Sequence, residues 1–316
     1  MSKQPLIEQL DAAIAELLAT PGVMPASVDA SIGELLRIAQ DVSTLPAPDF
    51  KASLKADLER KAHMSSVKPV VFRTGFRTVT PYLLPPGPEY VDFLKNVFGA
   101  VETERTETGP GRFHAEFRIG DSMLMIGVGA GRAMPSSLEL YVPNVDEVYK
   151  RAVDAGCKAV GPIEDAHWEP IRLGSVQDPA GNVWSIATHL GGNYIPEGRQ
   201  SLSACLVAKG AAGLVDFIKQ AFDGQEVRRW DWPGGMYASL KVGDAVVGVT
   251  ESGNHEWMPP MPSMVYLYVP DCDSWYQRAL QAGATSLSAP ANQHYGDRSG
   301  GVIDAWGNMW YMATPL

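Results

Sequence analysis

A histidine and a glutamate that alternate along one predicted strand are the first candidates for chemistry. Between residues 113 and 119 apolar and polar residues alternate with a period of two, so His114 and Glu116 share the polar face. An imidazole beside a carboxylate is a pair that general acid–base catalysis uses. The alternative is a hydrogen-bonded polar patch or a solvated strand face, because such pairs are common on strands.

Two long loops, 165–172 and 292–298, carry a histidine, an aromatic residue and an arginine in the same order. They contain His167, Trp168 and Arg172 in the first loop and His294, Tyr295 and Arg298 in the second. An aromatic plane beside a guanidinium suits stacking on a flat ligand and pairing with its carboxylate or phosphate. Equally compatible are salt bridges that lock each loop, from Arg172 to Asp165 and from Arg298 to Asp297.

The composition limits the class of protein. The 316 residues are 45% hydrophobic and 20% charged, which is typical of a globular chain of about two domains. The formal net charge of -10 argues against nucleic acid or an anionic membrane surface as a partner. The three cysteines lie far apart, and the first residues lack a continuous apolar run, so we expect a cytoplasmic protein without disulfides or a signal peptide.

Five sequence blocks occur twice, in the same order, in residues 70–190 and 200–316. For example, VDFLKNVF at 91–98 returns as VDFIKQAF at 215–222, and DPAGNVW at 178–184 returns as DAWGNMW at 304–310. The other blocks begin at residues 119, 140 and 151 and return at 242, 267 and 278. This repetition predicts two similar domains joined by a turn-rich linker near residues 191–198.

Each copy is itself predicted to contain two units with the order strand, helix, strand, strand, strand. In the first copy the predicted helices are 88–98 and 145–155, each followed or ended by a glycine. The predicted strands are 78–84, 101–106, 113–119, 122–128, 138–142, 158–163, 173–178 and 183–188. The alternation of side chains along the strands predicts that Trp184 and Trp310 face the helices and lie in the core.

Residues 1–66 differ from the repeats, being rich in Ala, Leu and charged residues with few aromatics. Apolar stripes at helical spacing predict three short amphipathic helices in this N-terminal region. We expect these helices to pack on each other, on the rest of the chain, or on a second copy to form a homodimer. The alternative is an interaction protein whose function lies in this helical arm.

The order of elements, with VDFLKNVF after the first strand and DPAGNVW at the end, resembles the vicinal oxygen chelate superfamily, which includes glyoxalase I, extradiol dioxygenases and bleomycin resistance proteins. The TPYLL and IGDSMLM segments are most similar to its PhnB-like branch. The resemblance implies an α+β fold: two tandem glyoxalase/bleomycin-resistance-like domains built from four βαβββ units. In this family paired units form a sheet whose concave face lines a cavity. Whether units pair within or between copies stays open.

The resemblance also implies where a divalent metal would be held. The family's coordinating positions fall at Thr80, Met125, Ser137 and Ser185 in copy one and at Ser203, Gly248, Met264 and Tyr311 in copy two. None of these residues supplies the family's imidazole or carboxylate, so we expect no metal and no cofactor.

Strand parity from these positions indicates what the cavities contain instead. In copy one it places Glu139 and Tyr141 inward with Ser137, together with His114 and Glu116. In copy two it places Tyr266 and Tyr268 inward with Met264, Tyr237 and Ser239. Copy one would then have the more polar cavity and copy two the more aromatic one.

These observations favour a metal-independent, glyoxalase/bleomycin-resistance-like protein that binds a small, partly aromatic molecule. The residues expected to contact this ligand are Tyr141, His167, Trp168, Arg172, Tyr237, Tyr266, Tyr268, His294, Tyr295, Arg298 and Tyr311. The alternative is a lyase, isomerase or dioxygenase with a non-standard site around His114, Glu116 and Glu139.

Overall fold

A computed structural model describes residues 75–316 except residues 130, 132 and 254–257. The predicted N-terminal helices, within residues 1–66, lie outside the described residues. In the described part of the chain, no helix is both long and apolar enough to span a bilayer.

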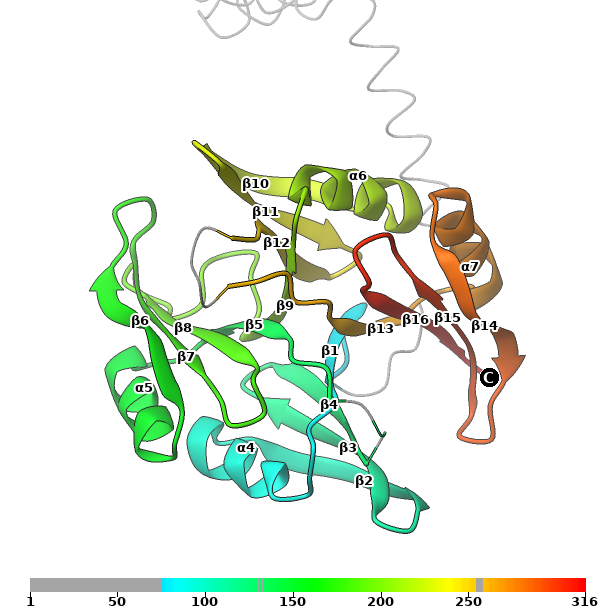
Figure 1. Ribbon diagram of the computed structural model, residues 1–316, viewed down its shortest axis with the longest axis horizontal. Helices are drawn as coiled ribbons and strands as arrows, with labels where there is room; N and C mark the ends of the chain where they lie inside the picture. Colours follow the sequence, from blue (N-terminus) through cyan, green and yellow to red (C-terminus); the bar gives the residue numbers. More distant parts are fainter. Residues whose placement is uncertain (1–74, 130, 132, 254–257) are drawn as a thin grey trace, which may run out of the picture. The chain divides into compact units, whose positions relative to one another are not determined.

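Four consecutive units with the predicted order of elements make up the fold (Figure 1). The first contains β1 (Val79–Leu83), α4 (Tyr90–Phe98), β2 (Val101–Gly109), β3 (Arg112–Ile119) and β4 (Ser122–Val128). The second contains β5 (Ser137–Tyr141), α5 (Val145–Asp154), β6 (Lys158–Asp165), β7 (Ile171–Gln177) and β8 (Val183–His189). The third contains β9 (Leu202–Ala208), α6 (Ala211–Phe222), β10 (Gln225–Trp232), β11 (Gly235–Val242) and β12 (Ala245–Glu251). The fourth contains β13 (Met264–Tyr268), α7 (Cys272–Gln281), β14 (Thr285–Asn292), β15 (Asp297–Ile303) and β16 (Met309–Pro315).

The strands form two eight-stranded sheets, and each sheet joins units from both copies. Sheet I has the order β14-β15-β16-β13-β1-β4-β3-β2, so the first unit pairs with the fourth. Sheet II has the order β10-β11-β12-β9-β5-β8-β7-β6, so the second unit pairs with the third. The joining ladders are antiparallel, between β1 and β13 and between β5 and β9. The units therefore pair between the copies, which settles the question that the sequence left open.

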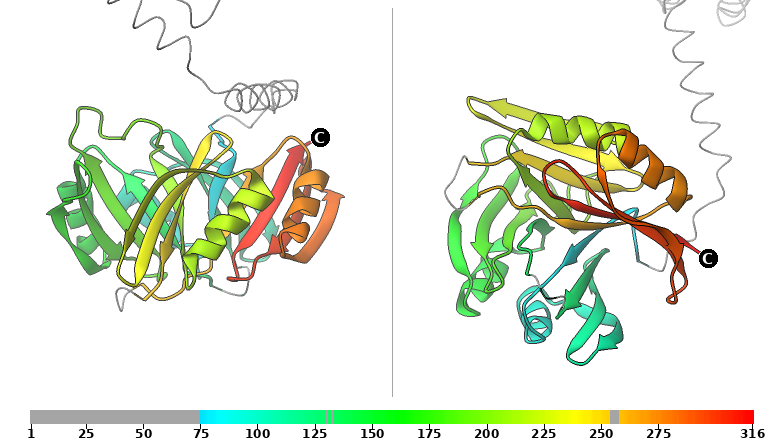
Figure 2. Two further views of the ribbon diagram at one scale, coloured as in Figure 1. Left: turned by 90° about the horizontal axis from the view of Figure 1, so that it is seen from above. Right: turned by 45° about the vertical axis from the view of Figure 1, so that its right-hand side comes forward.

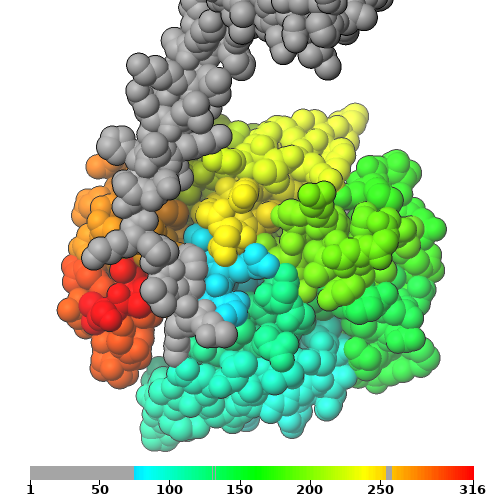
Figure 3. Space-filling view, turned by 180° about the vertical axis from the view of Figure 1, so that it is seen from behind, coloured from blue at the N-terminus to red at the C-terminus, as the bar shows by residue number. Residues whose placement is uncertain are grey.

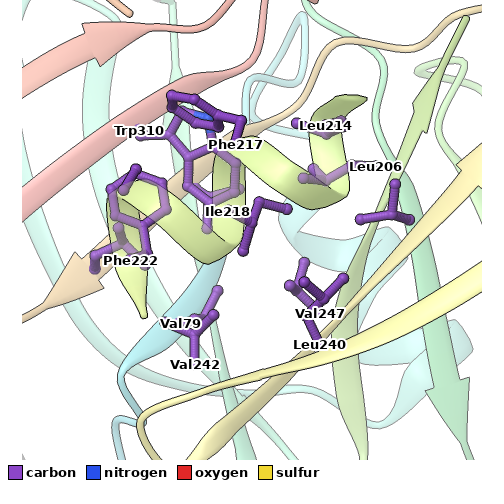
Figure 4. Close-up of a cluster of buried hydrophobic side chains, with 14 of the residues drawn as sticks. Val79, Leu206, Leu214, Phe217, Ile218, Phe222, Leu240, Val242, Val247 and Trp310 are labelled. Atoms are coloured by element: carbon purple, nitrogen blue, oxygen red, sulfur yellow. The ribbon is translucent and has the colours of Figure 1, made fainter. Parts of the chain in front are cut away.

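The helices lie on the outer faces of the curved sheets (Figure 2). Their apolar sides form two hydrophobic cores that follow the sequence copies rather than the sheets. One core packs α4 and α5 of the first copy, where the rings of Phe98 and Trp184 lie 4.2 Å apart. The other packs α6 and α7 of the second copy around Phe217, Phe222 and Trp310 (Figure 4). Trp184 and Trp310 are fully buried in these cores, which confirms their predicted helix-side position.

The repeated DPAGNVW block is a structural motif. The Asp178 carboxylate accepts hydrogen bonds from Tyr90 Oη at 2.6 Å and Trp184 Nε1 at 2.8 Å, and from the backbone and side-chain nitrogens of Asn182. Asn182 Oδ1 in turn accepts a bond from the backbone of Ser136 before β5. The second copy repeats the arrangement with Asp304, Asn308, Trp310 and Ser263. These residues fix the turn before the last strand of each copy.

The repeated Gly-Asp turn connects the two sheets. Asp121 Oδ1, in the turn between β3 and β4, accepts a bond from the backbone of Ser201 at the start of β9. Asp244, in the turn between β11 and β12, accepts bonds from the backbone and hydroxyl of Thr78 before β1. The space-filling view shows the second unit (green) adjoining both the first unit (cyan) and the third (yellow-green) (Figure 3).

Candidate functional site

The inner face of sheet I brings together a tyrosine, a histidine and a glutamate from two strands. Tyr82 Oη on β1 lies 3.0 Å from His114 Nδ1 on β3, and His114 Nε2 lies 3.5 Å from Glu116 Oε1. In the neutral imidazole this pattern assigns the proton to Nε2, because a carboxylate accepts hydrogen bonds, and Nδ1 then accepts the proton of the Tyr82 hydroxyl. The Glu116 side chain is buried, whereas that of His114 is 25% exposed.

Further tyrosines occupy the same face on the half of the sheet that comes from the fourth unit. Tyr266 and Tyr311 are register partners on β13 and β16, and their rings are parallel to within 7° with centroids 6.5 Å apart. Tyr266 Oη donates a hydrogen bond to Asp297 Oδ2, and the hydroxyl of Tyr295 lies 3.0 Å from that of Ser299. Burial raises the pKa values of Tyr82, Tyr266 and Tyr311, so all three hydroxyls stay protonated at neutral pH.

The inner face of sheet II is built around a buried arginine. Arg199, in the linker before β9, has a side chain that is only 6% exposed. Its guanidinium donates a hydrogen bond to Tyr237 Oη at 3.2 Å and lies 3.5 Å from Glu139 Oε2 on β5. Burial opposes the charge of Arg199, but Tyr237, Glu139 and Tyr141 outweigh it and raise its pKa. Arg199 also lines a hollow of about 470 Å³ formed with Asp121 and linker residues.

An ion pair links the two edge regions of sheet II. Arg228 on β10, at one edge, pairs with Glu169 in the loop between β6 and β7, at the other edge. The Arg228 guanidinium also lies 5.5 Å from the ring centre of Trp230, whose ring is 5.5 Å from that of Tyr237. The inner face of sheet II therefore combines aromatic rings with two arginines, each matched by a glutamate.

The positions that the resemblance implies for metal ligands gather on the two inner faces in sets of four. Sheet I brings together Thr80, Met125, Met264 and Tyr311. Sheet II brings together Ser137, Ser185, Ser203 and Gly248. These residues do not fit a catalytic divalent ion. Hydroxyls and thioethers compete poorly with water as ligands of such an ion, and a glycine has no side-chain ligand to offer. Among the residues that the structure describes, no three His, Cys, Asp or Glu side chains converge as ligands.

The grouping of candidate residues by sequence copy is wrong. His114 and Glu116 share a sheet with Tyr266 and Tyr268, whereas Glu139 lies in the other sheet with Tyr141, Tyr237 and Ser239. A single site around His114, Glu116 and Glu139 is therefore not formed. The expected contrast of a polar copy and an aromatic copy fails for the same reason, since each inner face takes one unit from each copy.

The arginines of the two long loops point toward the helices. Arg172 bonds both oxygens of Asp146 in the first turn of α5 and also Asp165. Arg298 bonds both oxygens of Asp273 in the first turn of α7. The locking salt bridge from Arg172 to Asp165 is thus present, whereas the Arg298 guanidinium bonds Asp273 and Asn292. Asp297 accepts a hydrogen bond from Tyr266.

The other predicted loop residues lie at the surface. They are His167, Trp168, His294 and Tyr295, all exposed. The rings of His167 and Trp168 contact each other edge to face, with centroids 4.7 Å apart. All three cysteines, Cys157, Cys205 and Cys272, are buried free thiols whose pKa values burial raises.

Sequence reasoning missed Tyr82, Arg199 and the Arg228–Glu169 pair. Tyr82 could have been found, because it lies two residues beyond Thr80 and so shares its face. Arg199 gave no signal, since it lies in a turn-rich linker without periodicity. The Arg228–Glu169 pair depends on the curvature of a whole sheet, which no local pattern specifies.

The two curved sheets carry helices on their outer faces and the candidate side chains on their inner faces. Comparisons relate part of this chain to a known superfamily of proteins. A family model described as Glyoxalase/Bleomycin resistance protein/Dioxygenase superfamily matches residues 87–186. An uncharacterized protein of Mycobacterium tuberculosis is 35% identical over 156 residues, covering 46% of this chain and 86% of that protein. One of Mycobacterium bovis is 35% identical over 127 residues, covering 37% of this chain and 84% of its own length.

Solved structures support the same fold. Glyoxalase I from Zea mays superposes with a TM-score of 0.59 at 12% identity, covering 75% of this chain and 92% of the maize chain. A putative dioxygenase from Bacillus subtilis gives 0.52 at 12% identity, covering 75% of this chain and 84% of that one. The family model thus relates residues 87–186 to the glyoxalase/bleomycin resistance/dioxygenase superfamily, also called the vicinal oxygen chelate superfamily, and the solved structures share the fold of the chain.

Proposed function

We propose that this protein binds a small, partly aromatic molecule on the inner face of one or both sheets without a divalent metal. The observation that carries the proposal is the replacement of the ligand set in sheet I. Where the family's metal ligands would lie, the chain has Thr80, Met125, Met264 and Tyr311. Aromatic rings and hydroxyls suit stacking on, and hydrogen bonding to, a flat organic molecule.

The two faces favour ligands of different charge. On sheet I, Glu116 and Asp297 lie near the tyrosines, which favours a neutral aromatic molecule. On sheet II, Arg199 and Arg228 favour one that carries a carboxylate or another anion. The TPYLL and IGDSMLM segments support a place in the PhnB-like branch, and the net charge and cysteines support a cytoplasmic location.

Metal content and binding of a neutral fluorescent probe test the proposal together. The full-length chain is analysed for Zn, Ni, Mn and Fe by mass spectrometry and titrated with 1-aminoanthracene, with and without EDTA. We expect far less than one metal ion per chain and a Kd that EDTA leaves unchanged. Replacing Tyr311→Ala removes one aromatic wall and should weaken binding roughly tenfold.

Tyr149→Phe is the matched control, because Tyr149 lies on α5 and its hydroxyl bonds Gly161 away from both inner faces. This variant should bind like the wild type. Stoichiometric metal combined with loss of binding in EDTA would contradict the proposal, and so would equal affinities of the Tyr311→Ala variant and the wild type.

A catalytic function, as a lyase or isomerase, is the second candidate. The specific observation in its favour is the hydrogen-bonded chain of Tyr82, His114 and Glu116 on sheet I.

A further inference from the structure

Both ring nitrogens of His114 are engaged within the protein. Nε2 faces Glu116 and Nδ1 faces the Tyr82 hydroxyl. The Tyr82 hydroxyl at Nδ1 therefore gives His114 a route by which a proton can pass to or from a molecule on this face. The two rings lie with centroids 5.5 Å apart and planes inclined by 30°.

A glycine on the intervening strand makes this contact geometrically feasible. Tyr82 and His114 lie on β1 and β3, which are separated by β4, where Gly127 is the register partner of His114. A Cβ atom at position 127 would lie 2.8 Å from Tyr82 Oη, well inside normal contact. Tyr82 thus crosses β4 through the space that Gly127 leaves.

We propose that Tyr82, His114 and Glu116 form a relay that removes a weakly acidic proton from a flat, neutral carbon acid bound on the inner face of sheet I. The inference rests on the proposed function, because it needs a small ligand on that face. Tyr82 is the catalytic residue, since it touches the ligand; His114 and Glu116 act through it.

The step balances as a double proton transfer. The ligand C–H bond breaks, its proton bonds to Tyr82 Oη, and the former Tyr82 proton passes to His114 Nδ1. The electron pair of the broken bond stays on the ligand, delocalised into its own unsaturated or leaving group. Glu116 stabilises the imidazolium that forms, and solvent later removes the extra proton.

The surroundings favour this direction of transfer. Glu104 on β2 is the register partner of Glu116, so a second carboxylate lies on the face that must stabilise the imidazolium. Tyr295 and Tyr311 are the other titratable groups near Tyr82. Since burial raises the pKa of Tyr82, its hydroxyl enters the relay as a proton donor to His114.

The repeat shows that the relay belongs to sheet I alone. The positions equivalent to Tyr82, His114 and Glu116 in sheet II are Cys205, Tyr237 and Ser239. That set lacks an imidazole and a carboxylate, and its Tyr237 hydroxyl accepts from Arg199. The two faces therefore differ in chemistry although their backbones are related.

The test uses 5-nitrobenzisoxazole, a flat neutral carbon acid, with the full-length protein. Removal of its ring C–H proton breaks the N–O bond, forms a nitrile and releases a coloured phenolate. We expect wild-type protein to accelerate this reaction. In the Tyr82→Phe and His114→Asn variants, the rate enhancement should be at least about tenfold smaller. The Gly127→Ala variant should lose a similar factor of rate enhancement, although this substitution alters no titratable group. The Tyr149→Phe variant should react as fast as the wild type.

The pH profile separates the relay from a structural role. The wild-type rate should rise with pH along a single ionisation and then level off. Glu116→Gln should shift the midpoint to lower pH, because it removes a negative charge that favours the imidazolium. A merely structural loss would lower the rate without moving the midpoint.

The proposal is overturned if wild-type protein gives no acceleration, if Tyr82→Phe and His114→Asn react within twofold of wild type, or if Tyr149→Phe loses as much. Melting temperatures and 1-aminoanthracene binding are measured for every variant. Retained binding with no effect on rate would reject the relay and leave the proposed function standing. Because Tyr82→Phe changes a single atom, it keeps the test decisive if Gly127→Ala fails to fold.

Discussion

At the scale of single residues, Arg199 is a buried charge that sequence patterns did not predict. It is a charged side chain held between Glu139 and Tyr237 on an inner face, with 6% of its side chain exposed. A buried ion pair contributes little by itself, but removing one partner leaves an uncompensated charge. Arg199 therefore matters for stability as well as for any anionic ligand.

Replacing Arg199→Met should lower the free energy of unfolding by about 3–5 kcal/mol, because Glu139 would be left buried without its cation. Urea denaturation measures the change. The double variant Arg199→Met with Glu139→Gln should recover much of the loss, since it removes both charges. A single variant within about 1 kcal/mol of wild type would contradict this account.

The candidate site was only partly predictable at this scale. Strand periodicity correctly placed His114 and Glu116 on one face, and the repeat correctly placed Trp184 and Trp310 in the cores. Tyr82, one of the two hydrogen-bond partners of His114, lies on another strand, and Arg199 lies in a linker. These contacts depend on the tertiary structure, which local sequence patterns do not determine.

At the scale of elements, the Gly-Asp turns explain why one short block is repeated so faithfully. Gly120 and Gly243 have φ values of 59° and 60°, and a Cβ atom on either would lie 2.2 Å from Ser201 Oγ or 2.1 Å from Thr78 Oγ1. Glycine is needed both for the left-handed backbone and for the close approach of the other sheet.

Gly120→Ala and Gly243→Ala should each destabilise the protein by more than the cost of a left-handed alanine alone, which is about 1–2 kcal/mol. Thermal and urea unfolding measure the difference. Gly99→Ala is the matched control, because Gly99 has a φ of 65° but its Cβ would meet no atom within 4 Å. Equal losses at Gly99 and Gly120 would show that the close approach is unimportant.

The elements themselves were well predicted. The expected helix 145–155 is α5, Val145–Asp154, and the expected strand 122–128 is β4 with the same bounds. Apolar periodicity and terminal glycines determine these limits locally. The pairing of β1 with β13 was not predictable, because the central strands of all four units are similar in sequence pattern.

At the scale of the whole described molecule, hydrophobic cores follow the sequence copies while sheets cross between them. Each copy therefore depends on the other for a complete sheet. The connection between the copies, at residues 190–200, includes Gly191 and Gly192, which are both exposed.

A protease site inserted between Gly191 and Gly192 tests this interdependence. After cleavage the two fragments should elute together in size-exclusion chromatography, since the β1–β13 and β5–β9 ladders still hold them. They should separate only in denaturant. Dissociation in native buffer would mean that these ladders contribute little to the association.

The crossed arrangement has a consequence for how such a chain can change over generations. Either half alone would expose the edges of β1 and β5 or of β13 and β9, so a chain with one copy would need a second molecule to complete both sheets. Each inner face can also diverge separately, since the two sheets are built from different units of the chain. The positions that the resemblance implies for metal ligands are likewise encoded separately for the two sheets, and no imidazole or carboxylate stands at any of them.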